Sequence, residues 1–411
     1  MVDWVIEAAR ELSPERVVVV TGAANSDEFE NVAVAVQDEP RGTGDAVAAA
    51  RPSLEGFDGD VLVLSGDSPL LTPEVLSELV DAHANGAAAA TILTFEPDRP
   101  LPYGRVIREG EAVTAVVEEV DATTEQREIR ELNSSTYVFD ARALWEALDR
   151  LEPNNAQGEL YLTDSIRHLV ESGHTVTAYR SPDAAAPVGV NTRAELAAAA
   201  AILRDRVNEA HMLAGVTIVD PATTWIEPEV ELEADAVVQP FTVLRGRTSV
   251  AARAEVGPHV VAVDAQVGPE ALVGPFCYLR PGTVLEAGAK AGTFVEVKNS
   301  TIGEHAKVPH LSYVGDAEIG AGTNVGAGSI TVNFPHQPGR EKGRTKIGRN
   351  VRTGVQNAFV APVEIGDDAW IAVGTVVTDD VPPGSLAGFA PRQVTKDGYV
   401  YERYGERESD D

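Results

Sequence analysis

The side chains best suited to chemistry in this sequence are Asp67 in the first half and Arg280, Lys298 and His310 in the second half. An imidazole accepts a proton near neutral pH, so His310 could act as a general base. Arg280 and Lys298 lie eighteen residues apart, so in a coil made of three six-residue repeats they would stack on one face. Two stacked cations suit one phosphate group, although local sequence also allows them to be solvated surface charges. For His310, periodicity alone favours a histidine stacked in a coil corner.

Two segments of the first half could hold a nucleotide and a metal ion. Residues 41–46 (Arg-Gly-Thr-Gly-Asp-Ala) form a glycine-bearing turn after a strand, which exposes backbone N–H groups to a phosphate or a base edge. Asp67 ends the run 64–67 (Leu-Ser-Gly-Asp), at the carboxyl end of a predicted central strand, where open α/β sheets bind ligands. Its carboxylate could hold Mg²⁺ against a triphosphate or cap the next turn, and the local pattern leaves both roles open.

The elements expected to position these first-half residues alternate between strands and helices. The β-branched runs 17–20, 32–36 and 61–64 predict buried strands, and Thr72 followed by Pro73 predicts the start of a helix. This alternation favours a Rossmann-like α/β fold. Residues 192–213 are rich in alanine and contain neither Pro nor Gly, so they predict one long linker helix.

Beyond residue 214 the apolar residues recur every six positions, which predicts a parallel β-helix with three hexapeptides per coil. The alternative is a β-sandwich, but sandwiches do not keep a period of six over so many positions. The repeating positions are Ile226, Leu232, Val238, Leu244, Val250 and Val256; Val267, Val273, Leu279 and Leu285; Ile302, Val308 and Val314; and Ile347, Thr353, Phe359, Ile365, Ile371 and Val377.

Composition restricts the class of protein. Sixty-four acidic and 33 basic residues give a formal charge of -31, which argues against nucleic acid or an anionic membrane as a partner. The single cysteine, Cys277, allows no internal disulfide and suits a reducing cytoplasm. No apolar run approaches the roughly 20 residues of a membrane helix, so we expect a cytoplasmic protein.

Several motifs, taken in order, resemble one family along nearly the whole chain. In the first half they are 37–39 (Gln-Asp-Glu) with 42–44 (Gly-Thr-Gly), 66–67, 103–105 (Tyr-Gly-Arg), 117–118, 121–122, Asn133, 155–159 (Asn-Ala-Gln-Gly-Glu) and 189–191 (Gly-Val-Asn). The family is the bifunctional N-acetylglucosamine-1-phosphate uridyltransferases and glucosamine-1-phosphate N-acetyltransferases, and the second half resembles it to about residue 395. The resemblance implies a nucleotidyltransferase domain followed by a left-handed parallel β-helix.

The resemblance also implies roles in uridylyl transfer, in which the sugar phosphate attacks the α-phosphorus of UTP. Uracil would be contacted by Gln37, Gly42 and Thr43. The N-acetylglucosamine phosphate would be held by Gly104, Glu118, Asn133 and Asn191, and Mg²⁺ would be bound by Asp67 and Asn191.

The N-terminus departs from the family pattern. The family opens with a strand, a Leu-Ala-Ala-Gly-x-Gly-Thr-Arg-Met loop and a Pro-Lys, which supply the triphosphate cradle and a catalytic cation. Residues 1–9 resemble the helix that follows that segment. A domain starting at Met1 would therefore be N-terminally incomplete, without an inner strand, and we expect it to have little uridyltransferase activity.

In the second half, the resemblance implies an acetyltransferase. His310 would be the base and Glu296 would orient or polarise it. The sugar phosphate would be bound by Arg280, Lys298, Tyr313, Asn324, Asn333 and Lys342. Acetyl-CoA would be bound by Ala327, Asn333, Phe334, Val355, Val373 and Arg392.

Three departures bear on the coenzyme. Phe334 replaces a usual tyrosine, Val355 replaces a serine and Ala390 replaces an arginine, for which Arg392 could substitute. They leave open the affinity for acetyl-CoA and the choice between glucosamine and galactosamine.

A zinc enzyme is the rival chemistry. His305 and His310 have the His-x4-His spacing that trimeric β-helix carbonic anhydrases use with a third histidine, for which His259 is the upstream candidate. Those enzymes lack a nucleotidyltransferase-like first domain, which weighs against this alternative.

The resemblance predicts three segments: a nucleotidyltransferase domain at 1–191, a linker helix at 192–213 and an acetyltransferase β-helix at 214–411. Because the family builds its acetyltransferase sites between β-helices, we expect a homotrimer. Its ligands would be glucosamine 1-phosphate, acetyl-CoA, UTP and N-acetylglucosamine 1-phosphate. Two alternatives are an enzyme with only acetyltransferase activity and a non-catalytic regulatory or assembly subunit of a sugar nucleotidyltransferase.

Overall fold

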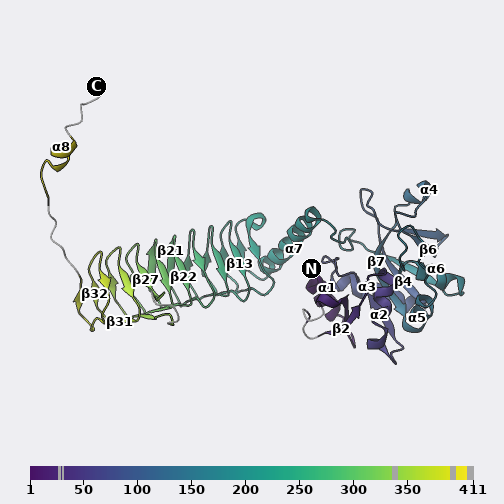
Figure 1. Cartoon of the computed structure of the whole chain (residues 1–411), viewed down its shortest axis with the longest axis horizontal. Coiled ribbons are helices and arrows are strands. Elements are labelled where there is room, and N and C mark those ends of the chain that lie inside the picture. Colours follow the sequence, from purple (N-terminus) through teal and green to yellow (C-terminus); the bar gives the residue numbers. More distant parts are fainter. Residues whose placement is uncertain (26–28, 30–31, 336–340, 389–394, 405–411) are drawn as a thin grey trace, which may run out of the picture. The chain divides into compact units, whose positions relative to one another are not determined.

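The computed structural model describes residues 1–25, 29, 32–335, 341–388 and 395–404. The chain divides into two compact units, residues 1–202 and 203–411, and the division falls within helix α7 (Arg193–Leu213). Figure 1 shows the elements of each unit. None of the helices in the described ranges is long and apolar enough to cross a membrane.

The first unit is an α/β layer structure. Its larger sheet has the order β6-β5-β7-β4-β8, with β3 paired to β7, while β1 and β2 form a separate parallel pair. The strands are β1 (Val18–Gly22), β2 (Ala33–Gln37), β3 (Asp60–Val63), β4 (Ala90–Phe95), β5 (Arg105–Glu109), β6 (Ala112–Val117), β7 (Leu132–Asp140) and β8 (Val176–Arg180). The helices are α1 (Val2–Arg10), α2 (Thr43–Ala49), α3 (Pro73–Gly86), α4 (Thr124–Arg127), α5 (Ala141–Leu148) and α6 (Asp164–Glu171).

The local signals for these elements are confirmed. The Thr72 hydroxyl accepts a hydrogen bond from the Val75 N–H at 3.4 Å, and Pro73 occupies the first turn of α3. Helix α3 then buries Leu76 and Leu79 completely against the sheet. The alanine-rich segment forms α7 as one continuous helix.

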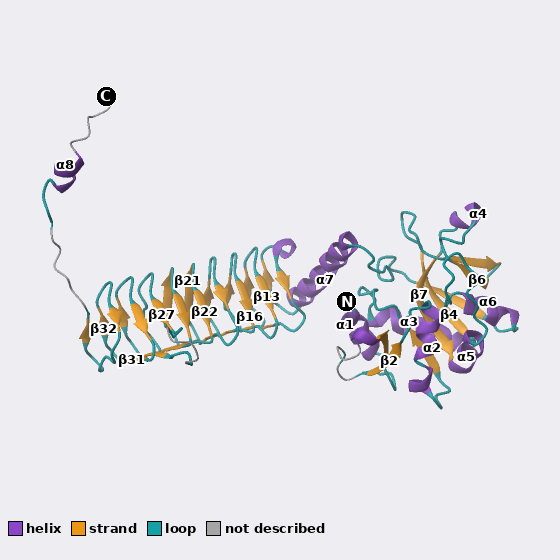
Figure 2. Ribbon diagram, in the orientation of Figure 1, coloured by secondary structure: helices purple, strands orange, loops and turns teal. Residues whose placement is uncertain are grey.

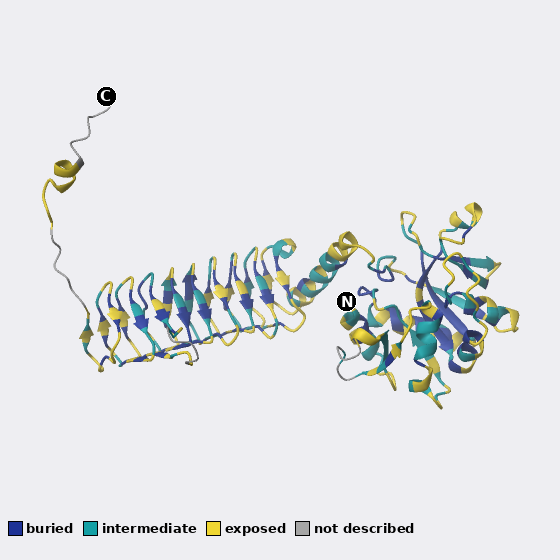
Figure 3. Ribbon diagram, in the orientation of Figure 1, coloured by how far each residue is buried: buried dark blue, intermediate teal, exposed yellow. Residues whose placement is uncertain are grey.

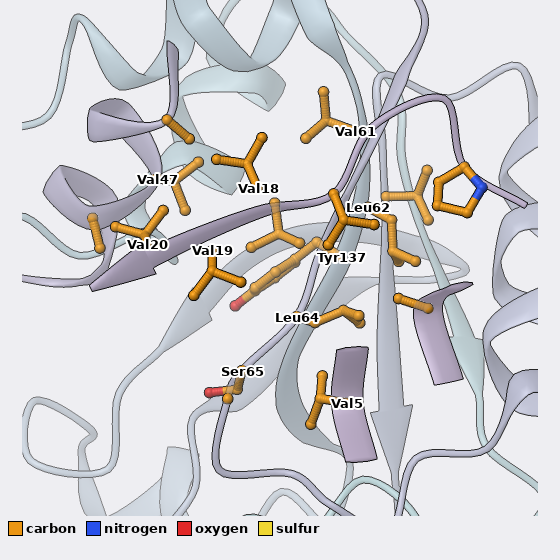
Figure 4. A pocket seen from close by; sticks show the side chains of 18 of the residues that line it. Val5, Val18, Val19, Val20, Val47, Val61, Leu62, Leu64, Ser65 and Tyr137 are labelled. Carbon is orange, nitrogen blue, oxygen red and sulfur yellow. The ribbon is translucent and has the colours of Figure 1, made fainter. Parts of the chain in front are cut away.

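One expectation about the first sheet is wrong. Strands β1, β2 and β3 were predicted to be buried, whereas their residues, apart from Ala35, are half-buried or exposed, unlike those of β4, which are all buried (Figure 3). For β1 and β3 the physical reason is a cavity of about 570 Å³ that both strands line (Figure 4).

The second unit is a parallel β-helix, as the period of six predicts (Figure 2). Successive coils pair in register at intervals of eighteen residues, as in Ile226 with Leu244, or of seventeen, as in Ala262 with Leu279. The step from Thr331 to Phe359 is longer and accommodates an insertion. The predicted inward residues are buried, except for Leu232, which is partly buried at the first coil.

Each face of the coil is a stack of short strands. One face contains β10 (Trp225–Ile226), β13 (Val243–Arg245), β16 (Val261–Val263), β19 (Tyr278–Leu279), β22 (Glu296–Lys298), β25 (Tyr313–Gly315), β27 (Ile330–Val332), β30 (Ala358–Val360) and β33 (Val376–Val377). The second contains β11 (Glu231–Leu232), β14 (Ser249–Val250), β17 (Gln266–Val267), β20 (Val284–Leu285), β23 (Thr301–Ile302), β26 (Ala317–Ile319), β28 (Thr345–Ile347) and β31 (Val363–Ile365). The third contains β9 (Thr217–Ile218), β12 (Val237–Val238), β15 (Glu255–Val256), β18 (Leu272–Val273), β21 (Lys290–Thr293) and β24 (Lys307–His310), and, through bridges at Asn324, β29 (Arg352–Thr353), β32 (Trp370–Ile371) and β34 (Leu386–Ala387). The short helix α8 (Tyr399–Tyr404) follows.

Several corners of the coil are made by large side chains. Phe241, His259, Phe276 and Phe294 take left-handed backbone conformations at successive corners. Their rings stack with centroids 4.7–5.1 Å apart, because successive corners lie one above another. The stacking offsets the cost of a positive φ in a non-glycine residue.

Candidate functional sites

The predicted uracil-binding residues gather around one loop. The Gln37 side-chain amide donates to the Gly42 carbonyl at 3.2 Å and to the Asp45 carboxylate at 2.8 Å. The Thr43 hydroxyl accepts from the Leu162 N–H at 2.9 Å. Gly42 has φ +122°, and a Cβ on it would lie 2.5 Å from the Leu160 carbonyl oxygen, so the loop requires glycine here.

The structure also brings together three predicted sugar-binding residues. A Cβ on Gly104 would lie 3.3 Å from the Glu118 carboxylate, and the Gly104 carbonyl accepts from the Asn133 N–H at 2.9 Å. The Asn133 side chain donates to the Tyr137 hydroxyl at 2.8 Å, and both residues are almost completely buried. Sequence reasoning missed Tyr137, because an aromatic residue in a strand is an ordinary core residue.

The electrostatics of this cluster come from burial. Removal from water raises the pKa of Glu118, against a hydrogen bond of 3.0 Å that the Thr163 hydroxyl donates to it. Burial also raises the pKa of the Tyr137 hydroxyl, so it stays protonated and can donate. The cluster presents hydrogen-bonding groups of the kind that hold sugar hydroxyls.

Asp67 and Asn191 lie on adjoining segments, as the metal prediction requires. The Asp67 carbonyl accepts from the Val190 N–H at 2.9 Å, and its carboxylate lies 3.3 Å from where a Cβ on Gly189 would be. The Gly189 N–H donates to the Tyr103 hydroxyl at 2.8 Å. One carboxylate and one amide fit Mg²⁺ that takes its remaining oxygens from phosphates and water.

In the β-helix, the three predicted cations form one positively charged group. Arg280 contacts Glu296 at 2.9 Å. Lys298 stands within hydrogen-bond range of Lys342, and this contact, then the like charge of Lys342, burial and the charge of Arg280 lower the pKa of Lys298. A bound dianion would relieve this repulsion, so the group is suited to a phosphate.

Asp316 holds two amides beside these cations. It accepts from the Asn333 side chain at 2.5 Å and from the Asn299 side chain at 2.6 Å. Burial tends to raise its pKa, but the two amide hydrogen bonds and the charges of Lys342 and Lys298 lower it. Asn333 also lies 3.5 Å from the Tyr313 hydroxyl. Asp316 was not predicted to be a site residue, although it closes the segment that contains His310.

His310 begins a column that contains three predicted acetyl-CoA residues. In successive coils the His310 carbonyl accepts from Gly328, the Ala327 carbonyl from Gln356 and the Val355 carbonyl from Gly374, at 3.2, 2.7 and 2.9 Å. The three donors come one residue after Ala327, Val355 and Val373, respectively. Therefore His310, Ala327, Val355 and Val373 occupy equivalent positions in successive coils. Val355 and Val373 are exposed, so the column offers an apolar surface beside the imidazole.

Some residues of the predicted acetyltransferase site make contacts other than those that were predicted. His310 is exposed at the end of β24, with Leu311 in the corner, and Glu296 contacts Arg280 instead of His310. Asn324 bridges Lys307 and Arg352 through its backbone. Phe334 is 73% exposed, which leaves its ring available to a ligand. Ala390 and Arg392 lie outside the described residues.

The structure places the histidines of the zinc alternative in separate surroundings. His259 is stacked between Phe241 and Phe276, whereas the ring of His305 lies over Gly288. Within the part of the chain that the structure describes, no three His, Cys, Asp or Glu side chains gather as a metal site. His259 therefore has the corner role that periodicity alone suggested for His310.

Comparison with known proteins covers both units. A family model described as the MobA-like NTP transferase domain matches residues 1–210. Proteins named bifunctional protein GlmU from Corynebacterium efficiens, Streptomyces avermitilis and Mycobacterium bovis are 45%, 47% and 46% identical to the chain. The three alignments cover 97%, 97% and 98% of this chain and 87%, 88% and 87% of the respective relatives.

Proposed function

Since the chain belongs to the GlmU family of bifunctional enzymes, we propose that it synthesises UDP-N-acetylglucosamine in two steps. The β-helix acetylates glucosamine 1-phosphate with acetyl-CoA, and the α/β domain transfers uridylate from UTP to the product. The single observation that carries the first step is the cationic group of Lys298, Lys342 and Arg280 on the β-helix that also bears His310.

In the acetylation step, His310 takes the proton from the sugar ammonium. The amine then attacks the thioester carbonyl carbon, and the thiolate of coenzyme A leaves and is protonated. Arg280, Lys298 and Lys342 hold the sugar phosphate. Glu296 holds Arg280 in place through the 2.9 Å ion pair.

Coenzyme binding uses the column on the same β-helix. Ala327, Val355 and Val373 provide the surface along which acetyl-CoA lies, with its thioester toward His310. Asn333 and Phe334 flank it, and Arg392 contributes charge to its phosphates. This arrangement is supported by the equivalent positions of the column residues in successive coils.

In the uridylyl transfer step, the domain acts mainly by binding the two substrates and orienting them for reaction. The loop with Gln37, Gly42 and Thr43 takes the uracil, and Gly104, Glu118 and Asn133 take the sugar. Asp67 and Asn191 hold Mg²⁺, which neutralises phosphate charge when it is bound.

The assembly and domain assignment follow from the same function. Residues 1–191 form the uridyltransferase domain, 192–213 the linker and 214–411 the acetyltransferase domain. Three β-helices assemble into a trimer whose acetyltransferase sites lie between them, in the cytoplasm, where the substrates are. Exposed apolar side chains along one face of the β-helix, such as Trp225, Val261 and Tyr278, support such an assembly.

The test is release of free thiol from acetyl-CoA with glucosamine 1-phosphate, measured at low and high salt. We expect His310→Ala to lower kcat by about 10²- to 10⁴-fold, the scale of general base catalysis. The matched control is His259→Ala, which removes a stacked corner ring and should keep the rate. Absence of release by the folded parent chain would contradict the acetyltransferase, and equal loss in both variants would remove His310 as the base.

A further inference from the structure

A row of side chains runs beside the proposed coenzyme column, on the neighbouring face of the β-helix. Its members pair in register, one in each of five successive coils, and the residue after each member is buried, so the members themselves point outward. They are Lys290, Lys307, Asn324, Arg352 and Trp370. We call them the basic row, because three of them are cations in a chain of formal charge -31.

Small residues separate the basic row from the column that begins at His310. On the coils of Ala327, Val355 and Val373 these residues are Gly326, Gly354 and Ala372. A Cβ on Gly354 would lie 2.6 Å from the Val373 nitrogen, so successive coils approach too closely for a side chain there. Since Thr353 is buried, no side chain stands between Arg352 and the corner at Val355. A ligand that lies along the column can therefore contact Arg352.

Arg352 differs from a nearby arginine in its partners. Arg349, three positions earlier, pairs with Asp367 at 2.9 Å. Arg352 is exposed, and its neighbours in the basic row are an amide and an indole. Within the described ranges it makes no ion pair and no side-chain hydrogen bond. Its N–H donors and its charge are thus available to an anionic ligand.

The length of the coenzyme arm brings its diphosphate to this part of the basic row. Successive coils lie about 4.8 Å apart, so the column extends about 14 Å from His310 to Val373. The arm of acetyl-CoA, from the sulfur to the first phosphorus, is about as long as four extended residues, roughly 13–14 Å. With the thioester at His310, the diphosphate lies at the coil of Val373. Arg352 is one coil before that point, within reach of an extended arginine side chain, whereas Lys307 lies on the coil of His310 and Lys290 on the coil before it.

We propose that Arg352 is a further coenzyme-binding residue and that its guanidinium binds the diphosphate of acetyl-CoA. The proposal rests on the proposed acetyltransferase function and on the direction of the coenzyme along the column. A guanidinium donates two parallel hydrogen bonds to phosphate oxygens, which a lysine ammonium does not. In a chain of formal charge -31, this cation also offsets the repulsion that a polyanionic coenzyme meets as it approaches.

The test is thiol release by the full chain with glucosamine 1-phosphate and three acetyl donors. Acetyl-CoA and its 3′-dephospho form contain the diphosphate, whereas acetylpantetheine contains only the arm. Arg352→Met should lower kcat/KM for the first two donors by the same factor, about tenfold or more, and leave kcat/KM for acetylpantetheine unchanged. Arg352→Lys keeps the charge and should recover part of the loss. The matched control is Arg247→Met, which removes another exposed arginine, on an earlier coil, and should leave all three values unchanged.

Each contrary outcome has its own meaning. Unchanged values with both diphosphate donors would remove Arg352 from coenzyme binding. A loss confined to acetyl-CoA would identify the 3′-phosphate as the ligand of Arg352 and overturn the assignment to the diphosphate. An equal loss with acetylpantetheine would show that the substitution distorts the column and would overturn the proposal. Absence of thiol release by the folded parent chain with all three donors would contradict the acetyltransferase itself, and with it the proposal.

Discussion

The Arg280 guanidinium and the Glu296 carboxylate are joined at 2.9 Å across adjacent coils of the β-helix. Tyr278 lies beside Glu296 in the register of β19 and β22, so Arg280, two residues further along the same face, reaches Glu296 diagonally. Arg280 is thus partly neutralised, whereas Lys298 stands beside a second lysine. Three cations, Arg280, Lys298 and Lys342, face two carboxylates, Glu296 and Asp316, so the site keeps a net positive charge.

Replacement of Lys342 by methionine should weaken binding of the sugar phosphate. The variant loses a charged hydrogen-bond donor to phosphate, and the KM for glucosamine 1-phosphate should rise roughly 10- to 100-fold with little change in kcat. The pKa of Lys298 should rise toward its usual value, because the neighbouring like charge is gone. Initial rates of thiol release across sugar phosphate concentrations measure the effect.

Lys346→Met is the matched control, since Lys346 lies on β28, another face of the coil, and is exposed. It should leave the KM unchanged. The loss in Lys342→Met should be smaller at high salt, where surface charges are screened. A fall in kcat at constant KM would contradict a role in binding phosphate.

Substitutions at Val355 should change the affinity for acetyl-CoA in opposite directions. Val355→Asp places a carboxylate in the column that begins with His310, so repulsion from the coenzyme phosphates should raise the KM for acetyl-CoA about tenfold or more. Val355→Ser restores the hydroxyl that the family resemblance implies and should lower it. Val219→Asp, an exposed position directly after β9 at the other end of the β-helix, is the control. Equal KM values for all three variants would remove the column from the coenzyme site.

Periodicity predicted the β-helix well because each inward position has one requirement, an apolar side chain of moderate size. Thr353 shows the limit of this rule, because it is polar and is nevertheless buried at an inward position of the series. Phe276 and Phe294 could not be predicted as corner residues, because their backbone conformation depends on rings supplied by neighbouring coils. Such cross-coil stacking is absent from any single hexapeptide.

The site was predicted less completely than the fold. The resemblance identified Asn133 and Asn333, and the structure adds the groups that hold their side chains, Tyr137 and Asp316. These partners follow four residues later in one case and lie seventeen residues earlier in the other, so only folding brings them into contact.

Replacement of Glu118 by glutamine should stabilise the first unit at high pH. Burial raises the pKa of Glu118, so folding favours its protonated form. That contribution is fully present below the usual carboxyl pKa and is lost as pH rises through the raised value. The variant should therefore be more stable than the parent by roughly 1–2 kcal/mol at pH 8, with a smaller difference at pH 4.5.

Urea unfolding of the first unit at both pH values measures this difference. Glu125→Gln, in the first turn of α4, is an exposed carboxylate and should show no pH-dependent gain. A constant difference between parent and Glu118→Gln at the two pH values would show that charge burial at Glu118 does not control stability.

A methyl group at Gly42 should disrupt the uracil loop more than the same change at another left-handed glycine. Gly42 has φ +122° and its Cβ would meet the Leu160 carbonyl oxygen at 2.5 Å, whereas Gly158 has φ +70° and open space around it. Gly158→Ala thus tests backbone strain alone, at about 1–2 kcal/mol. Gly42→Ala adds the collision and should cost roughly 1 kcal/mol more. It should also displace Arg41 and Gly44, whose backbone groups bond to Leu160 at 2.7 and 2.8 Å.

Urea unfolding of the first unit gives the two costs, and hydrogen exchange of the Leu160 and Gly44 amides reports whether the loop has opened. Faster exchange at both amides in Gly42→Ala, with parent-like exchange in Gly158→Ala, is the expected pattern. If the two variants lose equal stability and keep both amides protected, the close approach to Leu160 is not what requires glycine at position 42, and the positive φ alone accounts for it.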